Sequence, residues 1–193
     1  MQTEAMHPDG WTADKTATRT VIRAATGADV AAILGLVREL ATFEREPDAV
    51  RTTEAQLHDA LFRAEPSLFA LVAARGDQVV GTAIWFVNFS TWTGRHGIYL
   101  EDLIVDAGER RSGIGGRLLR ELARICVARG YGRLEWSVLD WNESALAFYR
   151  KLGAEAMSSW TVHRLSGQAL TALAGSPSIP PNSARQPTER NLT

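Results

Sequence analysis

The sequence predicts an α/β fold (α+β in a finer classification), in which helices cover both faces of a mixed, mostly antiparallel central sheet. In the front half, runs of alternating apolar and polar residues follow one another across short turns, which is typical of antiparallel strands. In the back half, strand-like runs alternate with segments of helical period, which is typical of β-α-β units. Together the two halves predict a sheet with both antiparallel and parallel neighbours.

The elements of the front half follow from local signals. Residues 18–25 alternate and predict the first strand. A Thr-x-x-Asp box at 26–29 precedes apolar residues at helical spacing over 30–40, which predicts the first helix. A Thr-x-x-Gln box at 53–56 predicts a second helix, whose apolar face includes Leu57.

The central elements are a hairpin, a third strand and a helix. The runs 68–74 and 79–87, which are split by Gly-Asp-Gln, predict a hairpin, and GIYLEDLIV at 97–105 predicts another strand. Residues 113–129 carry an apolar stripe of helical period and end at a glycine. RLEWSVL at 133–139 predicts the strand that follows this helix.

The back of the chain predicts a short helix over 142–152 and a last strand at 159–165. Residues 1–18 are polar without periodicity, and we expect a flexible extension there. Residues 175–193 are rich in Pro, Ser and Asn, and we expect a disordered tail. The predicted folded domain therefore covers residues 19–174.

Composition narrows the class of protein. The chain has 193 residues, 45% of them hydrophobic and 22% charged, and a formal net charge of −1. This predicts a globular protein and gives no reason to expect nucleic acid or a membrane as a partner. The single Cys126, the absence of a signal-like N-terminus and the absence of a long apolar run predict a cytoplasmic protein. The four histidines share no ligand spacing, so we expect no metal site.

The run RRSGIGG at 110–116 stands where an apolar strand passes into an amphipathic helix. The amide hydrogens at a helix N-terminus attract phosphate, glycine permits a close approach, and Arg110 and Arg111 add positive charge. The pattern R-x-x-G-x-G differs from both the Walker loop and the dinucleotide fingerprint. By itself it fits a phosphate site or a helix start that uses small residues for packing.

Four short motifs occur in one order: WTG at 92–94, YLEDLIV at 99–105, RRSGIGGRLL from 110 and WNESALAFYRKLGA at 141–154. In this order they resemble the GCN5-related N-acetyltransferase (GNAT) superfamily, and more closely its spermidine/spermine (diamine) and thialysine acetyltransferases. The likeness extends from about Val21 to Ala154. It implies the GNAT fold with a splayed pair of parallel strands, acetyl-CoA as co-substrate without a metal, and a homodimer.

The resemblance also implies a set of cofactor-binding residues. The glycine turn would hold the pyrophosphate through its backbone, the strand before it would pair with the pantetheine, and Asn142 would contact the pantetheine or merely cap its helix. These residues are Leu103, Ile104, Val105, Arg110, Arg111, Ser112, Gly113, Ile114, Gly115, Gly116 and Asn142.

Acetyl transfer from a thioester to an amine needs a base for the ammonium and an acid for the departing thiolate. Strict alternation would put Glu101 and Asp102 on opposite faces of their strand, both among apolar neighbours. The pattern alone leaves Glu101 as a cross-strand ion pair or a base. The YLED match implies that Glu101 is the general base, directly or through water. The matching tyrosine, Tyr149, would be the general acid, where core packing is the alternative.

Four further residues are candidates for the amine site. Asp102 would contact the ammonium or be a structural partner, and Glu44 would enter the channel or lie on a solvated face. Trp92 and Trp141 would each form a wall or pack in the core. The acids that polyamine acetyltransferases carry near WTG and before the last strand are absent here. This favours a short diamine, thialysine or another small amine over a long polycation.

The resemblance therefore implies an N-acetyltransferase that moves acetyl from acetyl-CoA to a primary amine of a small molecule by direct attack in a ternary complex. Two alternatives stay open: a protein amine as the acceptor, or a non-catalytic module that binds acyl-CoA for regulation.

Overall fold

The computed structural model describes residues 19–175, which divide into two compact units at Trp141/Asn142. The extension predicted at 1–18, and the predicted tail apart from Gly175, lie outside the described residues. The unit over 19–141 holds the sheet and three α-helices, and the unit over 142–175 holds two further helices.

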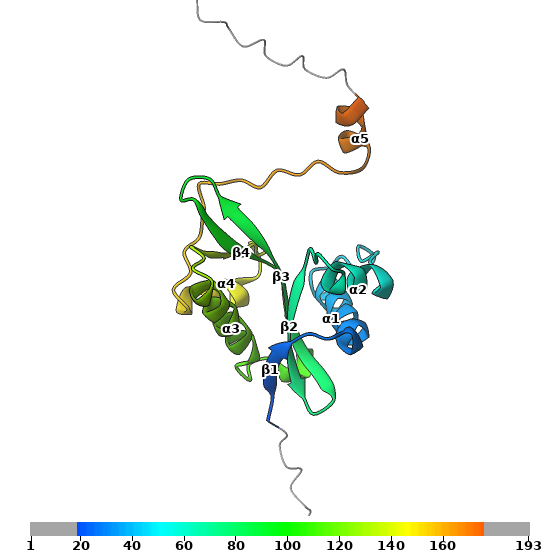
Figure 1. The fold of residues 1–193 in the computed structure, drawn as a ribbon, viewed down its shortest axis with the longest axis vertical. Coiled ribbons are helices and arrows are strands. Elements are labelled where there is room, and N and C mark those ends of the chain that lie inside the picture. The colour runs from blue at the N-terminus through cyan, green and yellow to red at the C-terminus, as the bar shows by residue number, and fades with distance from the viewer. Residues whose placement is uncertain (1–18, 176–193) are drawn as a thin grey trace, which may run out of the picture. The chain divides into compact units, whose positions relative to one another are not determined.

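The sheet has five strands in the order β1-β2-β3-β4-β5 (Figure 1). Neighbours are antiparallel from β1 to β4, and β4 and β5 are parallel. This confirms the predicted mixed sheet. The strands are β1 (Val21–Ala24), β2 (Phe69–Arg75), β3 (Gln78–Ser90), β4 (Arg95–Val105) and β5 (Leu134–Trp136).

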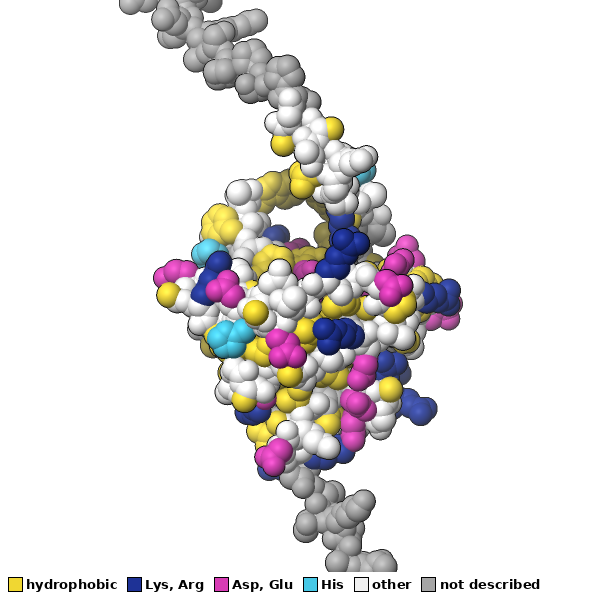
Figure 2. Space-filling view, turned by 90° about the vertical axis from the view of Figure 1, so that its right-hand side faces the viewer, with side chains coloured by type: hydrophobic (Ala, Val, Ile, Leu, Met, Phe, Trp, Pro, Cys, Tyr) yellow, Lys and Arg dark blue, Asp and Glu magenta, His cyan; other side chains and the backbone are white. Residues whose placement is uncertain are grey.

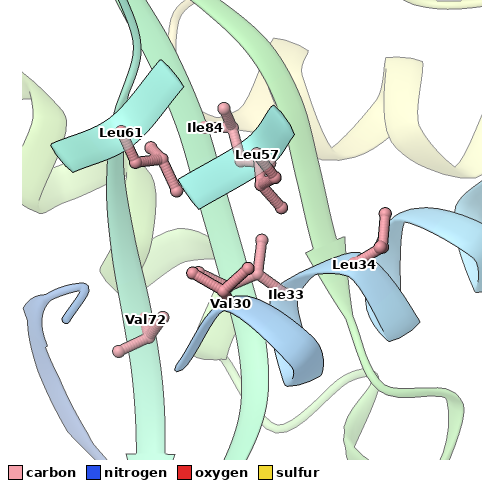
Figure 3. Close-up of a cluster of buried hydrophobic side chains, with 7 residues drawn as sticks. All are labelled: Val30, Ile33, Leu34, Leu57, Leu61, Val72 and Ile84. Atoms are coloured by element: carbon pink, nitrogen blue, oxygen red, sulfur yellow. The ribbon is translucent and has the colours of Figure 1, made fainter. Parts of the chain in front are cut away.

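One face of the sheet carries α1 (Val30–Phe43) and α2 (Glu54–Phe62), and both predicted capping boxes are present. The first box opens the 3₁₀ turn η1 (Gly27–Asp29) directly before α1. Side chains from α1, α2, β2 and β3 meet in a buried cluster (Figure 3). Its members are Val30, Ile33, Leu34, Leu57, Leu61, Val72 and Ile84.

The opposite face carries α3 (Ile114–Ala128), which lies across the sheet from α1 and α2 (Figure 1). Leu118 and Leu122 on its apolar stripe are fully buried, as the helical period predicted. Cys126 is also buried, its Sγ donates to the carbonyl of Arg133 at 3.5 Å, and burial raises the pKa of its thiol. It is therefore a core thiol.

The unit over 142–175 contains α4 (Glu143–Lys151), as predicted, and α5 (Gly167–Gly175), which the sequence pattern did not predict. The strand predicted at 159–165 is wrong: these residues form no strand, and all side chains from 155 to 175 are exposed. Alternation indicates which faces a strand would have. It supplies no neighbouring strand to accept the backbone hydrogen bonds.

On the side that carries α1 and α2, acidic and basic side chains are interspersed (Figure 2). Among the described helices, none combines the length and apolar character that a membrane crossing requires.

Candidate functional site

A β-bulge lies in the middle of β4. Asp102 pairs with Ile84 and Leu100 pairs with Trp85, so Glu101 is one extra residue without a partner of its own on β3. Ile84 and Trp85 are consecutive and point to opposite faces, and therefore Leu100 and Asp102 do so too. The strict alternation assumed from the sequence is wrong at this point.

The bulge brings carboxylates together on the α1 face. Asp102 shares the face of Ile84, which belongs to the buried cluster against α1 and α2. Its pKa is raised from 3.8 to about 6, mainly by burial and then by repulsion from Glu101 and Glu44. Glu44 caps the end of α1, and burial raises its pKa as well. Glu44 is therefore close enough to act electrostatically on Asp102.

Both charges that act on Asp102 are negative, so the carboxylates repel one another. Glu101 itself is exposed, whereas Asp102 is partly buried. We call Glu44, Glu101 and Asp102 the acidic group. A group of this kind is suited to a cationic ligand, because a cation relieves the repulsion and restores some of the solvation lost on burial.

The parallel strands separate beside the acidic group. β4 and β5 pair along Ile98–Leu100 and Leu134–Trp136, and β4 then continues to Val105 with β3 as its described partner. This confirms the predicted splay. The edge of β4 over Leu103–Val105 is thus the place where an extended ligand could add backbone hydrogen bonds.

The glycine turn joins β4 to α3 through the 3₁₀ turn η2 (Ala107–Glu109). Arg111 (φ 64°) and Gly113 (φ 83°) are in the left-handed region, and Gly113 is the N-cap of α3. Hydrogen bonding within the helix begins when the Arg117 amide donates to the Gly113 carbonyl at 3.1 Å. Among the described residues, no acceptor receives the amide hydrogens of 113–116. They form the donor set that a phosphate needs.

Two arginines of this region have structural contacts. Arg75 makes a bidentate ion pair with Glu109, which ties the turn to β2. Arg110 donates from Nε to the carbonyl of Val105 at 3.3 Å, and its Cζ lies 4.9 Å from the ring centroid of Phe43. The guanidinium of Arg110 is therefore directed toward the end of α1, which the sequence did not predict.

Trp92 is not brought near the acidic group within one chain. It lies in the tight turn between β3 and β4, and 86% of its surface is exposed. The six residue steps of β4 from Arg95 to Glu101 span about 20 Å at 3.3 Å per residue. Trp141, the other candidate wall, lies against the end of α1, with its ring centroid 5.7 Å from that of Phe43. Phe43 was not a predicted site residue, although its position directly before the candidate Glu44 could have indicated that it lies close to the site.

The remaining candidates lie in the unit over 142–175. Asn142 caps α4, because its Oδ1 accepts from the Ala145 amide at 3.2 Å. Tyr149 lies on α4 with its ring centroid 5.3 Å from that of Phe148, and burial raises the pKa of its phenol. Like any tyrosine of pKa 10 or above, it is protonated at neutral pH.

Comparison with known proteins assigns the family. Residues 33–154 match the model of the acetyltransferase (GNAT) family, which is more than half of the chain. The chain belongs to this family. It is therefore an acetyl-transferring enzyme, and enzymes of this family use acetyl-CoA as the co-substrate.

Relatives and a solved structure agree with this GNAT assignment. The enzyme is 36% identical over 166 residues to a thialysine N-epsilon-acetyltransferase of Bos taurus, which covers 80% of this chain and 97% of the relative. It is 30% identical over 197 residues to an L-ornithine N5-acetyltransferase of Arabidopsis thaliana, and this match covers 79% of this chain and 86% of the relative. An integron cassette protein from the Vibrio cholerae mobile metagenome shares the fold with a TM-score of 0.69 and 26% identity, covering 81% of this chain and 98% of the other.

Proposed function

We propose that this GNAT enzyme acetylates a primary amine of a small molecule, such as a short diamine, thialysine or a related amine, by direct attack in a ternary complex. The observation that carries the proposal is the acidic group beside the splay of β4 and β5. An alkyl primary amine is a cation at neutral pH, and carboxylates that lie close enough to repel one another attract such a cation. The thialysine and ornithine acetyltransferases among its relatives support an amine of this size.

Within the acidic group we assign two different roles. Glu101 is exposed and lacks a ladder partner, so it is free to take the proton of the ammonium, directly or through one water. Asp102 and Glu44 are more buried and hold the ammonium in place. Binding of the cation would lower the pKa of Asp102 back toward its ordinary value, because an opposite charge favours the carboxylate form.

Tyr149 is assigned the role of general acid toward the departing thiolate. A thiolate of ordinary pKa near 8.5 accepts a proton readily when a protonated donor is held beside it. A phenol of ordinary pKa near 10 carries its proton throughout the neutral range, and the burial that raises the pKa of Tyr149 keeps that proton in place.

The residues of the turn and of the strand edge fit acetyl-CoA. The amides of Arg111, Ser112 and Gly113–Gly116 would hold the pyrophosphate, with Arg110 beside them, and the backbone of Leu103–Val105 would pair with the pantetheine. The amide hydrogens without an acceptor at 113–116 and the open edge of β4 support this assignment. For Asn142, the hydrogen bond to Ala145 favours the capping role.

A homodimer and a cytoplasmic location complete the proposal. Large apolar side chains of the 142–175 unit are exposed, which supports burial against a second copy. They are Leu152, Met157, Trp160, Val162, Leu165, Leu170 and Leu173. Light scattering after size exclusion should give twice the mass of 21.1 kDa. The single cysteine supports a reducing compartment.

The test of function is acetyl-CoA-dependent release of free thiol with a panel of diamines, polyamines, thialysine, ornithine and aminoglycosides. We expect turnover with short amines and little with spermine. Binding of acetyl-CoA without turnover of any panel member would contradict the proposal. Acetylation of added protein substrates would then identify a protein amine as the acceptor, and no acetylation at all would indicate the regulatory module.

A further inference from the structure

Two arginines and two aromatic rings form a stack at the end of α1. The Cζ of Arg45 lies 5.0 Å from the ring centroid of Trp141. The ring centroids of Trp141 and Phe43 are 5.7 Å apart. The Cζ of Arg110 lies 4.9 Å from the ring centroid of Phe43. The stack joins the end of α1, the turn after β4 and the segment after β5. The aromatic faces hold both guanidinium groups in place.

The backbone of Arg45 has a conformation that favours glycine. Its φ is 67°, and it occupies the first position beyond the cap of α1. There the Glu46 amide donates to the Ala41 carbonyl at 2.8 Å and the Arg45 amide donates to the Thr42 carbonyl at 3.2 Å. This pair of bonds is the motif that most often carries glycine at the Arg45 position. An arginine held there against backbone strain indicates a use for its side chain.

The positive charge of Arg45 is available to a ligand. Among the described residues, no ion pair includes Arg45, and its side chain is exposed. Within the part of the chain that the structure describes, the contact with the Trp141 ring is made without an acceptor for the guanidinium N–H groups, and these groups match a carboxylate with two parallel hydrogen bonds.

Arg45 directly follows Glu44, a member of the acidic group. These two consecutive residues therefore offer opposite charges at the end of one helix: Glu44 acts on Asp102, while Arg45 stacks on Trp141. We propose that Arg45 binds the α-carboxylate of the acceptor, so that the acceptor is a diamino acid and not a plain diamine. This inference rests on the proposed function, because it assumes that the acidic group holds the amine that is acetylated.

The test compares acceptors that differ by the carboxylate alone: lysine with cadaverine, ornithine with putrescine, and thialysine with bis(2-aminoethyl) sulfide. For the wild type we expect kcat/KM to be about 10- to 100-fold higher for each amino acid, the range of a charge-assisted bidentate contact. In Arg45→Gln this preference should vanish, while kcat/KM for the diamines changes by less than about threefold. The matched control is Arg38→Gln, which removes an exposed positive charge from α1 and should keep the preference.

A second variant separates recognition from folding. Arg45→Gly suits the positive φ, so it should unfold at the same temperature as the wild type or higher, yet lose the preference as Arg45→Gln does. Equal losses for amino acids and diamines in both variants would overturn the inference, and so would a raised KM for acetyl-CoA with an unchanged preference. Turnover by the wild type without preference for the carboxylated acceptor would refute this inference alone, whereas no turnover of any amine would refute the proposed function as well.

Discussion

Asp102→Asn is expected to stabilise the enzyme above pH 6 while weakening its hold on the amine. The pKa of Asp102 is raised from 3.8 to about 6. At 1.36 kcal/mol per pH unit, this difference means that the ionised carboxylate of Asp102 lowers the free energy of unfolding by about 3 kcal/mol. Asparagine has nearly the same shape and carries no charge.

The pH dependence follows from where the proton is held. Because the folded protein binds the Asp102 proton more tightly than the unfolded chain does, this carboxyl favours the folded state at low pH. That contribution is lost as the pH rises from about 4 through about 6. The stability of Asp102→Asn relative to the wild type should therefore grow by about 2 kcal/mol between pH 4.5 and 7.5. For a chain of this size that amounts to about 4–8 °C in unfolding temperature.

Urea unfolding of both proteins at pH 4.5, 6 and 7.5 measures this difference. Asp77→Asn, which removes an exposed carboxylate from the β2–β3 turn, is the control and should show no such trend. In a separate kinetic assay without urea, the KM of Asp102→Asn for the amine should rise about tenfold, since one charge-assisted contact to the ammonium is lost. A gap in stability that is constant with pH would refute the claim that the acidic group places Asp102 under repulsion and burial.

Three further substitutions test the assigned roles. Tyr149→Phe should lower kcat about 100-fold or more while calorimetry shows unchanged acetyl-CoA binding, and an unchanged kcat would remove the acid role. Glu101→Gln should lower kcat/KM about 100-fold at pH 7. This loss relative to the wild type should shrink toward pH 10, because the amine then loses its proton without a base. A loss of kcat/KM that is constant with pH would argue against Glu101 as the base. Gly113→Ala forces a side chain onto a φ of 83° and should cost about 1–2 kcal/mol in thermal unfolding and weaken acetyl-CoA binding, whereas the helical Gly35→Ala should not.

Local signals were sufficient for much of the fold. The capping boxes at 26–29 and 53–56 were predicted correctly because the groups that satisfy the first turn lie within four residues of one another. The glycine turn was likewise predictable, since the change from a strand to a helix of clear period marks its position. The splay of β4 from β5 came with the family resemblance and not with any pattern.

Features that depend on distant partners were not predictable. Residues 159–165 alternate as a strand does, but a strand forms where another strand accepts its hydrogen bonds. Trp92 was a plausible wall until the length of β4 showed how far the hairpin turn extends from Glu101. The stack of Arg45 on Trp141 joins residues almost one hundred positions apart, and neither residue alone suggests the other.

The bulge at Glu101 shows why one residue decides the geometry of the acidic group. Tyr99 pairs with Phe86 and Asp102 pairs with Ile84, and since Phe86 and Ile84 are two residues apart they share a face. Tyr99 and Asp102 therefore share that face although they are three residues apart, which a regular strand forbids. Without the extra residue, Asp102 would share the face of Leu100, away from Glu44, and Glu101 would have a ladder partner. The insertion thus both releases Glu101 from the ladder and turns Asp102 toward the end of α1, where the amine is expected to bind.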